Sequence, residues 1–309
     1  MKNVNPSESK SHLRHQVSLA MQKSGGSTIT LRAKSCHLAL LSEFLAKNFK
    51  LMDLSQLKPF HVHAFFDEIR DGKALGTLQN YAASMRSALR LMGCKNLADS
   101  DHISNEVLGI SGRSRGGTHR AITQQEIDVA IADALKIDQG FSLVIELMSM
   151  FGLRIREAIT SPKSLVMWLK ALEKGSDFID LIFGSKGGRP RRTRVFNKEE
   201  AIDLIKRCIK YVNSNGGWLI NRETREKALE FVYYSARKIN LTGEISPHSF
   251  RYAFTHRQFD QYLDLGFEEE IALAFLAEDL GHGNGRKTWV RRVYLKGHPR
   301  LTCKTVHSD

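Results

Sequence analysis

The stretch Ser246–Arg251, with the sequence Ser-Pro-His-Ser-Phe-Arg, opens the segment around which the rest of this chain is organised. His248 and Arg251 stand three positions apart, so both side chains project from one face of a helix. Pro247 is typical of a helix start, where free backbone N–H groups attract an anion. This pattern indicates a phosphate-binding site, but a lone His-x-x-Arg is common and needs support from the rest of the chain.

Two further motifs follow towards the C-terminus. Gly281-His282 would place an imidazole just beyond a helix, although a C-cap glycine followed by an exposed histidine is the simpler interpretation. Tyr294 lies among basic residues, in Arg-Arg-Val-Tyr-Leu-Lys. Neighbouring cations favour phenolate, which makes a tyrosine a candidate nucleophile. The alternative is a core tyrosine packed by its apolar neighbours.

An arginine upstream is a second candidate, beside Arg251, for donating hydrogen bonds to a phosphate. Arg154 stands in Gly-Leu-Arg-Ile-Arg-Glu, directly after a nearly continuous apolar stretch that predicts a buried helix. Glu157 is three residues further on and can orient it. A purely structural Arg–Glu pair is the alternative, because a buried guanidinium is costly unless it is paired. Arg156 is expected to be a surface residue or a contact to a phosphate backbone.

A basic turn lies between these motifs. Residues 178–183 and 192–196 alternate as strands do and predict a β-hairpin. Lys186 lies in its glycine-rich turn, where glycines would let the loop approach DNA closely. A solvated basic loop is the alternative.

Composition points to a polyanionic partner. The chain of 309 residues carries 46 Lys and Arg against 33 Asp and Glu, a net charge of +13. This excess is typical of nucleic-acid-binding proteins, although an ordinary basic soluble protein can also show it. The four cysteines are widely spaced, which argues against a zinc site or a disulfide framework. Without a membrane span or a signal peptide, the chain is expected to be soluble and intracellular.

Four segments are expected along the chain. Residues 1–26 read as a weakly patterned N-terminal arm, and residues 27–110 as a helical domain with apolar residues at three- and four-residue steps. Residues 111–119 are rich in glycine and predict a flexible linker. Residues 120–309 form the larger domain. The predicted fold class is mainly α (α+β): two mostly helical domains with one small antiparallel hairpin.

Several basic side chains outside these motifs are candidates for contacts to the DNA backbone, with a solvated surface as the alternative for each. They are Arg32, Lys34, Arg86, Arg90, Arg113, Arg115, Arg189, Arg191, Arg192, Arg291 and Arg292.

Each motif is weak alone, but their order and contexts resemble those of the tyrosine recombinase (phage integrase) family across most of the chain. The helical domain is similar to the core-binding domain of that family, which clamps DNA together with the catalytic domain. The resemblance implies the catalytic set Arg154, Lys186, His248, Arg251, His282 and Tyr294, with Glu157 in support.

The resemblance also implies the roles of these residues. The two arginines would hold the scissile phosphate while Tyr294 attacks it to form a 3′-phosphotyrosyl enzyme. Lys186 would protonate the 5′-oxygen, and the histidines would donate hydrogen bonds or shuttle protons. Neither ATP nor a metal is expected as a cofactor, since the sequence offers no Walker loop and no carboxylate cluster.

The implied partners are double-stranded recombination sites, and the implied location is the bacterial cytoplasm, in association with the nucleoid. The free protein is expected to be a monomer and to form a tetramer on two DNA duplexes, and accessory DNA-bending factors are candidate partners. A C-terminal tail that acts on a neighbouring protomer is a further expectation, with a frayed terminus as the alternative.

The sequence departs from the family pattern in two ways. Tyr252 stands where a second histidine usually follows the His-x-x-Arg motif, and the intervals from Arg251 to His282 and from His282 to Tyr294 are long. Tyr252 is therefore the alternative nucleophile. The alternative functions are DNA relaxation like that of a type IB topoisomerase, and a catalytically silent DNA-binding relic.

Overall fold

The computed structural model of the chain describes residues 5–114, 116–185, 188–283 and 285–301. These residues divide into two compact units, Met1–Ser114 and Arg115–Asp309. Both are mostly helical, and the second also holds a two-stranded antiparallel sheet. The mainly α fold predicted from the sequence is therefore confirmed. No helix in the described ranges combines the length and the apolar character needed to cross a membrane.

The first unit is a bundle of helices joined by short turns. Its α-helices are α1 (Pro6–Gln22), α2 (Thr28–Phe49), α3 (Pro59–Ile69), α4 (Leu75–Leu91) and α5 (Lys95–Ala98). The side chains of Asn5 and Ser27 cap α1 and α2 by accepting hydrogen bonds from the first turn of each helix. Leucine, phenylalanine and methionine side chains from the helices fill one common core.

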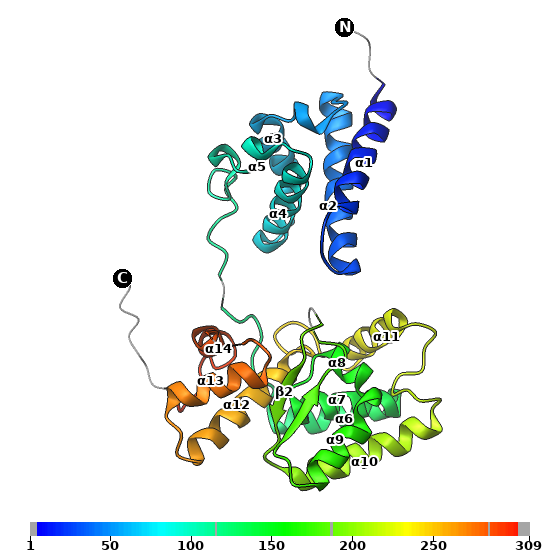
Figure 1. The fold of residues 1–309 in the computed structure, drawn as a ribbon, viewed down its shortest axis with the longest axis vertical. Helices are drawn as coiled ribbons and strands as arrows, with labels where there is room; N and C mark the ends of the chain where they lie inside the picture. Colours follow the sequence, from blue (N-terminus) through cyan, green and yellow to red (C-terminus); the bar gives the residue numbers. More distant parts are fainter. Residues whose placement is uncertain (1–4, 115, 186–187, 284, 302–309) are drawn as a thin grey trace. The chain divides into compact units, whose positions relative to one another are not determined.

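Helix α1 differs from the arm expected over residues 1–26. It packs along α2, and the two helices run side by side in Figure 1. Leu13, Val17 and Met21 recur at four-residue steps and are all buried in the core of the first unit. The mean hydropathy of this helix is low, so its narrow apolar stripe is hidden among polar residues in the sequence.

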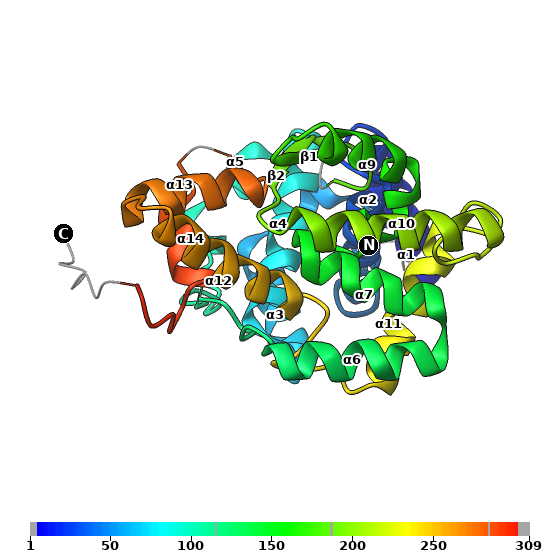
Figure 2. The same ribbon diagram turned by 90° about the horizontal axis from the view of Figure 1, so that it is seen from below.

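The second unit begins with α6 (Gln124–Ile137) and α7 (Gln139–Phe151). A capping box begins α6, since Thr123 and Glu126 bond each other's backbone N–H groups. Helix α7 is buried along most of its length and lies between α6 and α10 in Figure 2.

Gly152 ends α7 in the left-handed conformation, with φ of 59°. A Cβ at this position would collide with the ring of Phe254, so the close packing of α7 requires glycine. Arg154 follows at once, as the N-cap residue of the short helix α8 (Ile155–Thr160).

After α9 (Leu165–Glu173), the chain forms the only sheet in the described residues. Strands β1 (Phe178–Leu181) and β2 (Arg191–Arg194) pair antiparallel, with Leu181 opposite Arg191 and Phe178 opposite Arg194. The predicted hairpin is present, with strands slightly shorter than expected. Alternation along β2 turns Arg191 and Thr193 towards the interior and Arg192 towards solvent.

The remaining helices complete the second unit. They are α10 (Lys198–Ser214), α11 (Arg225–Lys238), α12 (Ser249–Asp264), α13 (Glu269–Asp279) and α14 (Lys287–Val293). The last three share a separate core that includes Phe259, Leu276 and Leu295. Ion pairs from Lys287 to Glu270 and from Arg291 to Glu269 tie α14 to the first turn of α13.

If α1 belongs to the core, replacing a buried leucine on it should destabilise the first unit. We expect Leu13→Ala to lower the free energy of unfolding by about 2–5 kcal/mol, the range for buried leucines. Leu19→Ala removes the same atoms from an exposed position of the same helix. It should change the free energy of unfolding by less than about 0.5 kcal/mol. Denaturant unfolding of the full chain, followed by circular dichroism, measures both. Equal effects would mean that α1 lies outside the core.

Candidate active site

Five of the side chains singled out in the sequence meet in the second unit, at the ends of several helices. Arg154 precedes α8, His248 and Arg251 open α12, His282 follows α13, and Tyr294 ends α14. We call this set the Arg–His–Tyr cluster. Its members lie as many as 140 positions apart in the sequence (294 − 154), so the packing of the helices brings them together.

Arg251 is the most buried member, with an exposure of 0%. Its Nη1 donates to the backbone oxygen of Gly152 at 2.5 Å, its Nη2 donates to that of Leu280, and its Nε donates to Tyr294 Oη at 3.3 Å. Burial lowers the pKa of Arg251 to about 10, which leaves the guanidinium charged at neutral pH. Carbonyls at the ends of α7 and α13 thus hold a full positive charge beside the tyrosine.

Arg154 lies beside it and is less buried. Its Nη1 donates to Glu157 Oε1 at 2.7 Å, and its Nη2 approaches the same Leu280 oxygen that accepts from Arg251, at 3.5 Å. The side chain of Arg154 is 24% exposed, whereas that of Glu157 is fully buried. The predicted Arg154–Glu157 pair is therefore present, and donors of Arg154 remain open towards solvent.

Tyr294 is 2% exposed, and its phenol faces two members of the cluster. Besides Arg251, the oxygen lies 3.4 Å from His248 Nε2. The main-chain oxygen of Tyr294 contacts His256 Nε2 at 2.9 Å, which fixes the end of α14 against α12. The nucleophile candidate is thus held between an imidazole nitrogen and a guanidinium group.

The two histidines of the cluster are kept neutral by their surroundings. Burial, together with the charges of Arg251 and Arg154, lowers the pKa of His248 to about 4 and that of His282 to about 3. His119 adds a further repulsive contribution at His248. Both imidazoles are therefore neutral at neutral pH, and each has one ring nitrogen that can accept a hydrogen bond.

Two neighbours of the cluster were missed by sequence reasoning. The ring of Trp289 lies 4.4 Å from that of His282 and 5.2 Å from that of Tyr294. His119, which falls in the predicted linker, lies 6.0 Å from the ring of His248 and contacts the main-chain oxygen of Gly243. An aromatic residue between the histidine and tyrosine motifs was a usable signal for Trp289, but no local pattern marks His119.

Tyr252, the alternative nucleophile, is also near. Its ring centroid lies 4.7 Å from that of Tyr294, but burial and then the neighbouring Tyr294 raise its pKa to about 12. The hydroxyl of Tyr252 lies close to Gly117, where an added Cβ would come within 2.7 Å of it. Its phenolate is therefore harder to form, and its oxygen is turned towards the segment that precedes α6.

The structure places Arg191 differently from the DNA-contact prediction. Its side chain is 3% exposed and donates to Glu157 Oε2 at 2.9 Å. The strand alternation explains the difference: a sequence rich in arginine gives no sign of which face of β2 turns inward. Arg191 is therefore an internal residue adjoining the cluster.

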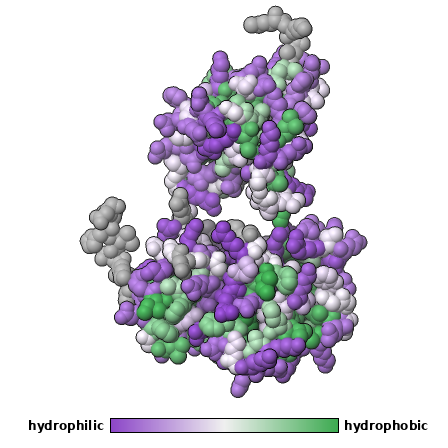
Figure 3. Space-filling view, viewed as in Figure 1, coloured by the Kyte–Doolittle hydropathy of each residue, from purple (hydrophilic) through white to green (hydrophobic). Residues whose placement is uncertain are grey.

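The other predicted DNA contacts fall into three groups. Arg115 lies outside the described residues, as does Lys186 of the predicted catalytic set. Lys34, Arg86 and Arg291 are partly buried: Lys34 bonds Ser24 and Ser87, Arg86 bonds Asn105 and the Ile103 oxygen, and Arg291 pairs with Glu269. Six are exposed: Arg32, Arg90, Arg113, Arg189, Arg192 and Arg292. The face of each unit drawn in Figure 3 is mainly hydrophilic.

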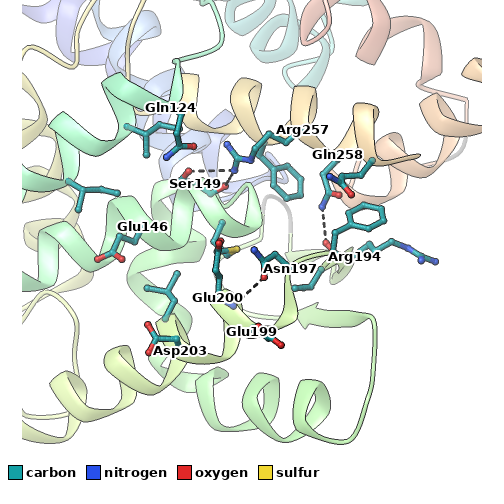
Figure 4. A pocket seen from close by; sticks show the side chains of 18 of the residues that line it. Gln124, Glu146, Ser149, Arg194, Asn197, Glu199, Glu200, Asp203, Arg257 and Gln258 are labelled. Atoms are coloured by element: carbon teal, nitrogen blue, oxygen red, sulfur yellow. Dashed lines mark hydrogen bonds between the residues drawn. The ribbon is translucent and has the colours of Figure 1, made fainter. Parts of the chain in front are cut away.

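A pocket of about 710 Å³ also opens in the second unit, but its described lining contains no member of the cluster. Figure 4 shows that Arg257 and Gln258 of α12 reach into it from one side, facing Glu146 and Ser149 of α7. Acidic and basic side chains both line it, so its charge favours no single ligand. Within the described ranges, no three His, Cys, Asp or Glu side chains gather as a metal site would need.

Taken together, the cluster can bind an anion and attack it. Arg154 and Arg251 supply fixed positive charge, and two neutral imidazoles lie beside the phenol of Tyr294. Planar guanidinium groups bind phosphate through paired hydrogen bonds. A phosphodiester that reached the open side of Arg154 would lie next to a guanidinium group that shares the Leu280 oxygen with Arg251.

Comparison with known proteins gives a consistent picture. A family model described as Integrase matches residues 109–257, and one described as Phage integrase, N-terminal, matches residues 10–98. No curated protein matches the sequence.

Solved structures share the fold across nearly the whole chain. A XerH site-specific recombinase bound to its difH substrate is 14% identical, with a TM-score of 0.57 over 96% of this chain and 94% of its own. A lambda integrase dimer on a COC′ core site is 14% identical, with a TM-score of 0.62 over 96% and 80%. A Tn1549 transposon integrase with transposon end DNA is 13% identical, with a TM-score of 0.58 over 94% and 96%.

The electrostatics of the cluster can be tested directly by NMR. We expect the imidazole signals of His248 and His282 to show no titration midpoint above about pH 5, because burial and the arginine charges oppose protonation. The variants His248→Gln and His282→Gln assign the signals, and the urea-unfolded chain serves as the control, with midpoints near 6.5. A midpoint near 6.5 for either residue in the folded protein would contradict the arrangement described.

Proposed function

Since this chain belongs to the tyrosine recombinase (phage integrase) family, we propose that the Arg–His–Tyr cluster is its active site and that it cuts and rejoins DNA through a covalent 3′-phosphotyrosyl intermediate. The observation that carries the proposal is the position of Tyr294 Oη, 3.3 Å from Arg251 Nε and 3.4 Å from His248 Nε2. The biological role is that of a site-specific recombinase that integrates or excises a mobile element.

The first step is the attack of Tyr294 on the scissile phosphorus. His248 is neutral, so its Nε2 can accept the phenolic proton while the oxygen forms the new bond. A bound phosphodiester brings negative charge next to His248, which favours the imidazolium that results. Arg251 stabilises phenolate character on the same oxygen through its Nε donor.

The arginines stabilise the charge that develops on the phosphate. Arg154 and Arg251 both reach the Leu280 oxygen, so their guanidinium groups lie side by side around one point. Both are held before substrate arrives, and little reorganisation is needed when the pentacoordinate transition state forms. His282 adds a further hydrogen-bonding group beside Tyr294, with a ring separation of 5.8 Å.

The leaving 5′-oxygen needs a proton. We propose Lys186, which lies outside the described residues, as the proton donor. The bond from phosphorus to the 5′-oxygen breaks as the bond to the tyrosine oxygen forms. One ester replaces another of similar energy, and the reverse reaction with a second 5′-hydroxyl rejoins the strand. In this scheme, side chains supply all of the charge stabilisation.

The partner is double-stranded DNA, and we propose contacts from both units. The similar XerH, lambda and Tn1549 proteins were solved as complexes with DNA sites. The exposed arginines of both units can lie along a phosphate backbone. We further propose a free monomer that assembles as a tetramer on two duplexes, with DNA-bending accessory factors, at the bacterial nucleoid.

Neither alternative function is favoured. The two matching family models and the three similar structures described above are those of integrases and recombinases. A silent relic would have no need to keep a buried arginine against a buried tyrosine, since an unused buried charge only costs stability.

The nucleophile can be tested with a nicked suicide DNA substrate that traps covalent adducts. Tyr294→Phe removes one oxygen and keeps the ring packing, so we expect normal DNA binding and no detectable adduct. Tyr252→Phe is the matched control, since it removes the same atom from a ring 4.7 Å away, and adducts should persist. Adducts formed by the Tyr294 variant but not by the Tyr252 variant would reverse the assignment.

The arginine clamp can be tested by a change that keeps charge. Arg154→Lys loses paired hydrogen bonding to phosphate, and we expect cleavage to slow by about 10²- to 10³-fold, equivalent to roughly 3–4 kcal/mol. Arg207→Lys disturbs another Arg–Glu pair of the same unit, to Glu146, away from the cluster, and should cleave normally. Single-turnover cleavage at saturating DNA measures both. Wild-type cleavage by the Arg154 variant would remove this residue from the site.

A further inference from the structure

Strand β2 carries two neighbouring arginines with opposite surroundings. The side chain of Arg191 is 3% exposed, whereas that of Arg192 is 63% exposed and pairs with Asp180 at the surface. Fully buried arginines are rare and costly unless their charge is matched. The burial of Arg191 therefore needs an explanation that a contact to the DNA backbone does not provide.

The contacts of Arg191 connect three elements of the active site. Its Nη1 donates to Thr193 Oγ1 at 2.7 Å and to the main-chain oxygen of Asp279 at the end of α13. Its Nη2 lies 3.3 Å from the Gly152 oxygen at the end of α7 and 2.9 Å from Glu157 Oε2. These are the two helix ends whose carbonyls also hold Arg251.

Glu157 stands between two arginines and uses a different oxygen for each side chain. Its Oε2 accepts from Arg191, and its Oε1 accepts from Arg154 at 2.7 Å. The Oε2 atom also accepts from the backbone N–H of Arg154 at 2.9 Å. The carboxylate of Glu157 thus links the buried Arg191 to Arg154, the arginine that faces the proposed phosphate site.

We propose that Arg191 is a positioning residue for DNA cleavage: it keeps Glu157 ionised and in place, so that Glu157 orients Arg154 towards the scissile phosphate. This inference rests on the proposed function, because it assigns a role within that same active site. Arg191 itself would not touch the DNA.

The charge balance around Glu157 supports the proposal. Burial, the largest single influence, would raise the pKa of the carboxyl, but the surrounding arginines together lower it to about 2, and the charge and hydrogen bond of Arg191 on β2 are the largest of their contributions. The charges of Arg251 on α12 and of Arg154 at the start of α8 contribute less. Without Arg191, the pKa of Glu157 should rise, and a protonated Glu157 would lose its ion pair with Arg154 as the pH falls.

A purely structural role makes a different prediction. Arg191 also fills space, since a Cβ on Gly281 would come within 2.7 Å of its Cδ. If Arg191 only packs the interior, its loss should lower stability and slow cleavage by the same factor at every pH. It should also act independently of Glu157. The pH profile and the coupling to Glu157 therefore separate the two roles.

The test compares single-turnover formation of the covalent adduct on a suicide half-site at saturating DNA, from pH 5.5 to pH 8.5. Arg191→Met keeps much of the side-chain length without the charge. We expect adduct formation about tenfold slower than in the wild type at pH 8, with the ratio of variant to wild-type rates falling further as the pH decreases. Arg207→Met, which removes an arginine from the Glu146 pair, should show a constant ratio near one.

A double-mutant cycle supplies the second measurement. In a Glu157→Gln background, Arg191→Met should slow adduct formation less than threefold, because there is no carboxylate left to keep ionised. Arg191→Lys keeps the charge and should restore a ratio that does not change with pH. If melting followed by circular dichroism shows that Arg191→Met is unfolded, Arg191→Gln, which keeps a hydrogen-bond donor but removes the charge, takes its place in the cycle.

The outcomes distinguish the two levels of the proposal. A wild-type protein that forms no adduct would overturn the proposed function. The positioning role alone would be overturned by a different result, in which the wild type does form adducts. In that case the ratio of Arg191→Met to wild-type rates would be constant with pH, and the loss of rate would be as large in the Glu157→Gln background as in the wild type.

Discussion

The second unit depends on one constraint: guanidinium groups buried at its centre must find acceptors. The carbonyls at the C-terminal ends of α7 and α13 meet this need, because helix ends leave oxygens unpaired and carry partial negative charge. Gly152 and Leu280 accept from Arg251, and the Asp279 oxygen accepts from Arg191. The two helices must therefore end at the same place, and that place becomes the site.

This constraint sets the electrostatic character of the site. Glu157 is the buried carboxylate that balances the arginines, and it remains ionised because they surround it. The balance is incomplete. Burial, followed by the excess positive charge, lowers the pKa of His248 and of His282 and keeps both neutral. A region with surplus fixed cations and neutral imidazoles is prepared for an anion, and a bound phosphodiester would bring the missing negative charge.

Much of the fold and most of the candidate site could be predicted because the signals are local. Helical periodicity, the capping box at Thr123 and the hairpin depend on neighbours a few residues apart, and each is present in the structure. Arg154, with Glu157 one helical turn on, was recognisable in the same way. Helix α1 escaped because its apolar stripe is narrow, so only its packing on α2 reveals it.

The sequence by itself determined which groups are available: two arginine motifs, two histidines and a tyrosine at helix boundaries. Only the tertiary structure decided which of them meet and which are buried. Arg191 and Arg192 are chemically identical neighbours, yet one is internal and the other faces water. Alternation along a strand places neighbouring side chains on opposite faces, but long-range packing against α13 decides which face of β2 turns inward. Local pattern carries no information about that partner, and for the same reason His119 became visible only in the folded chain.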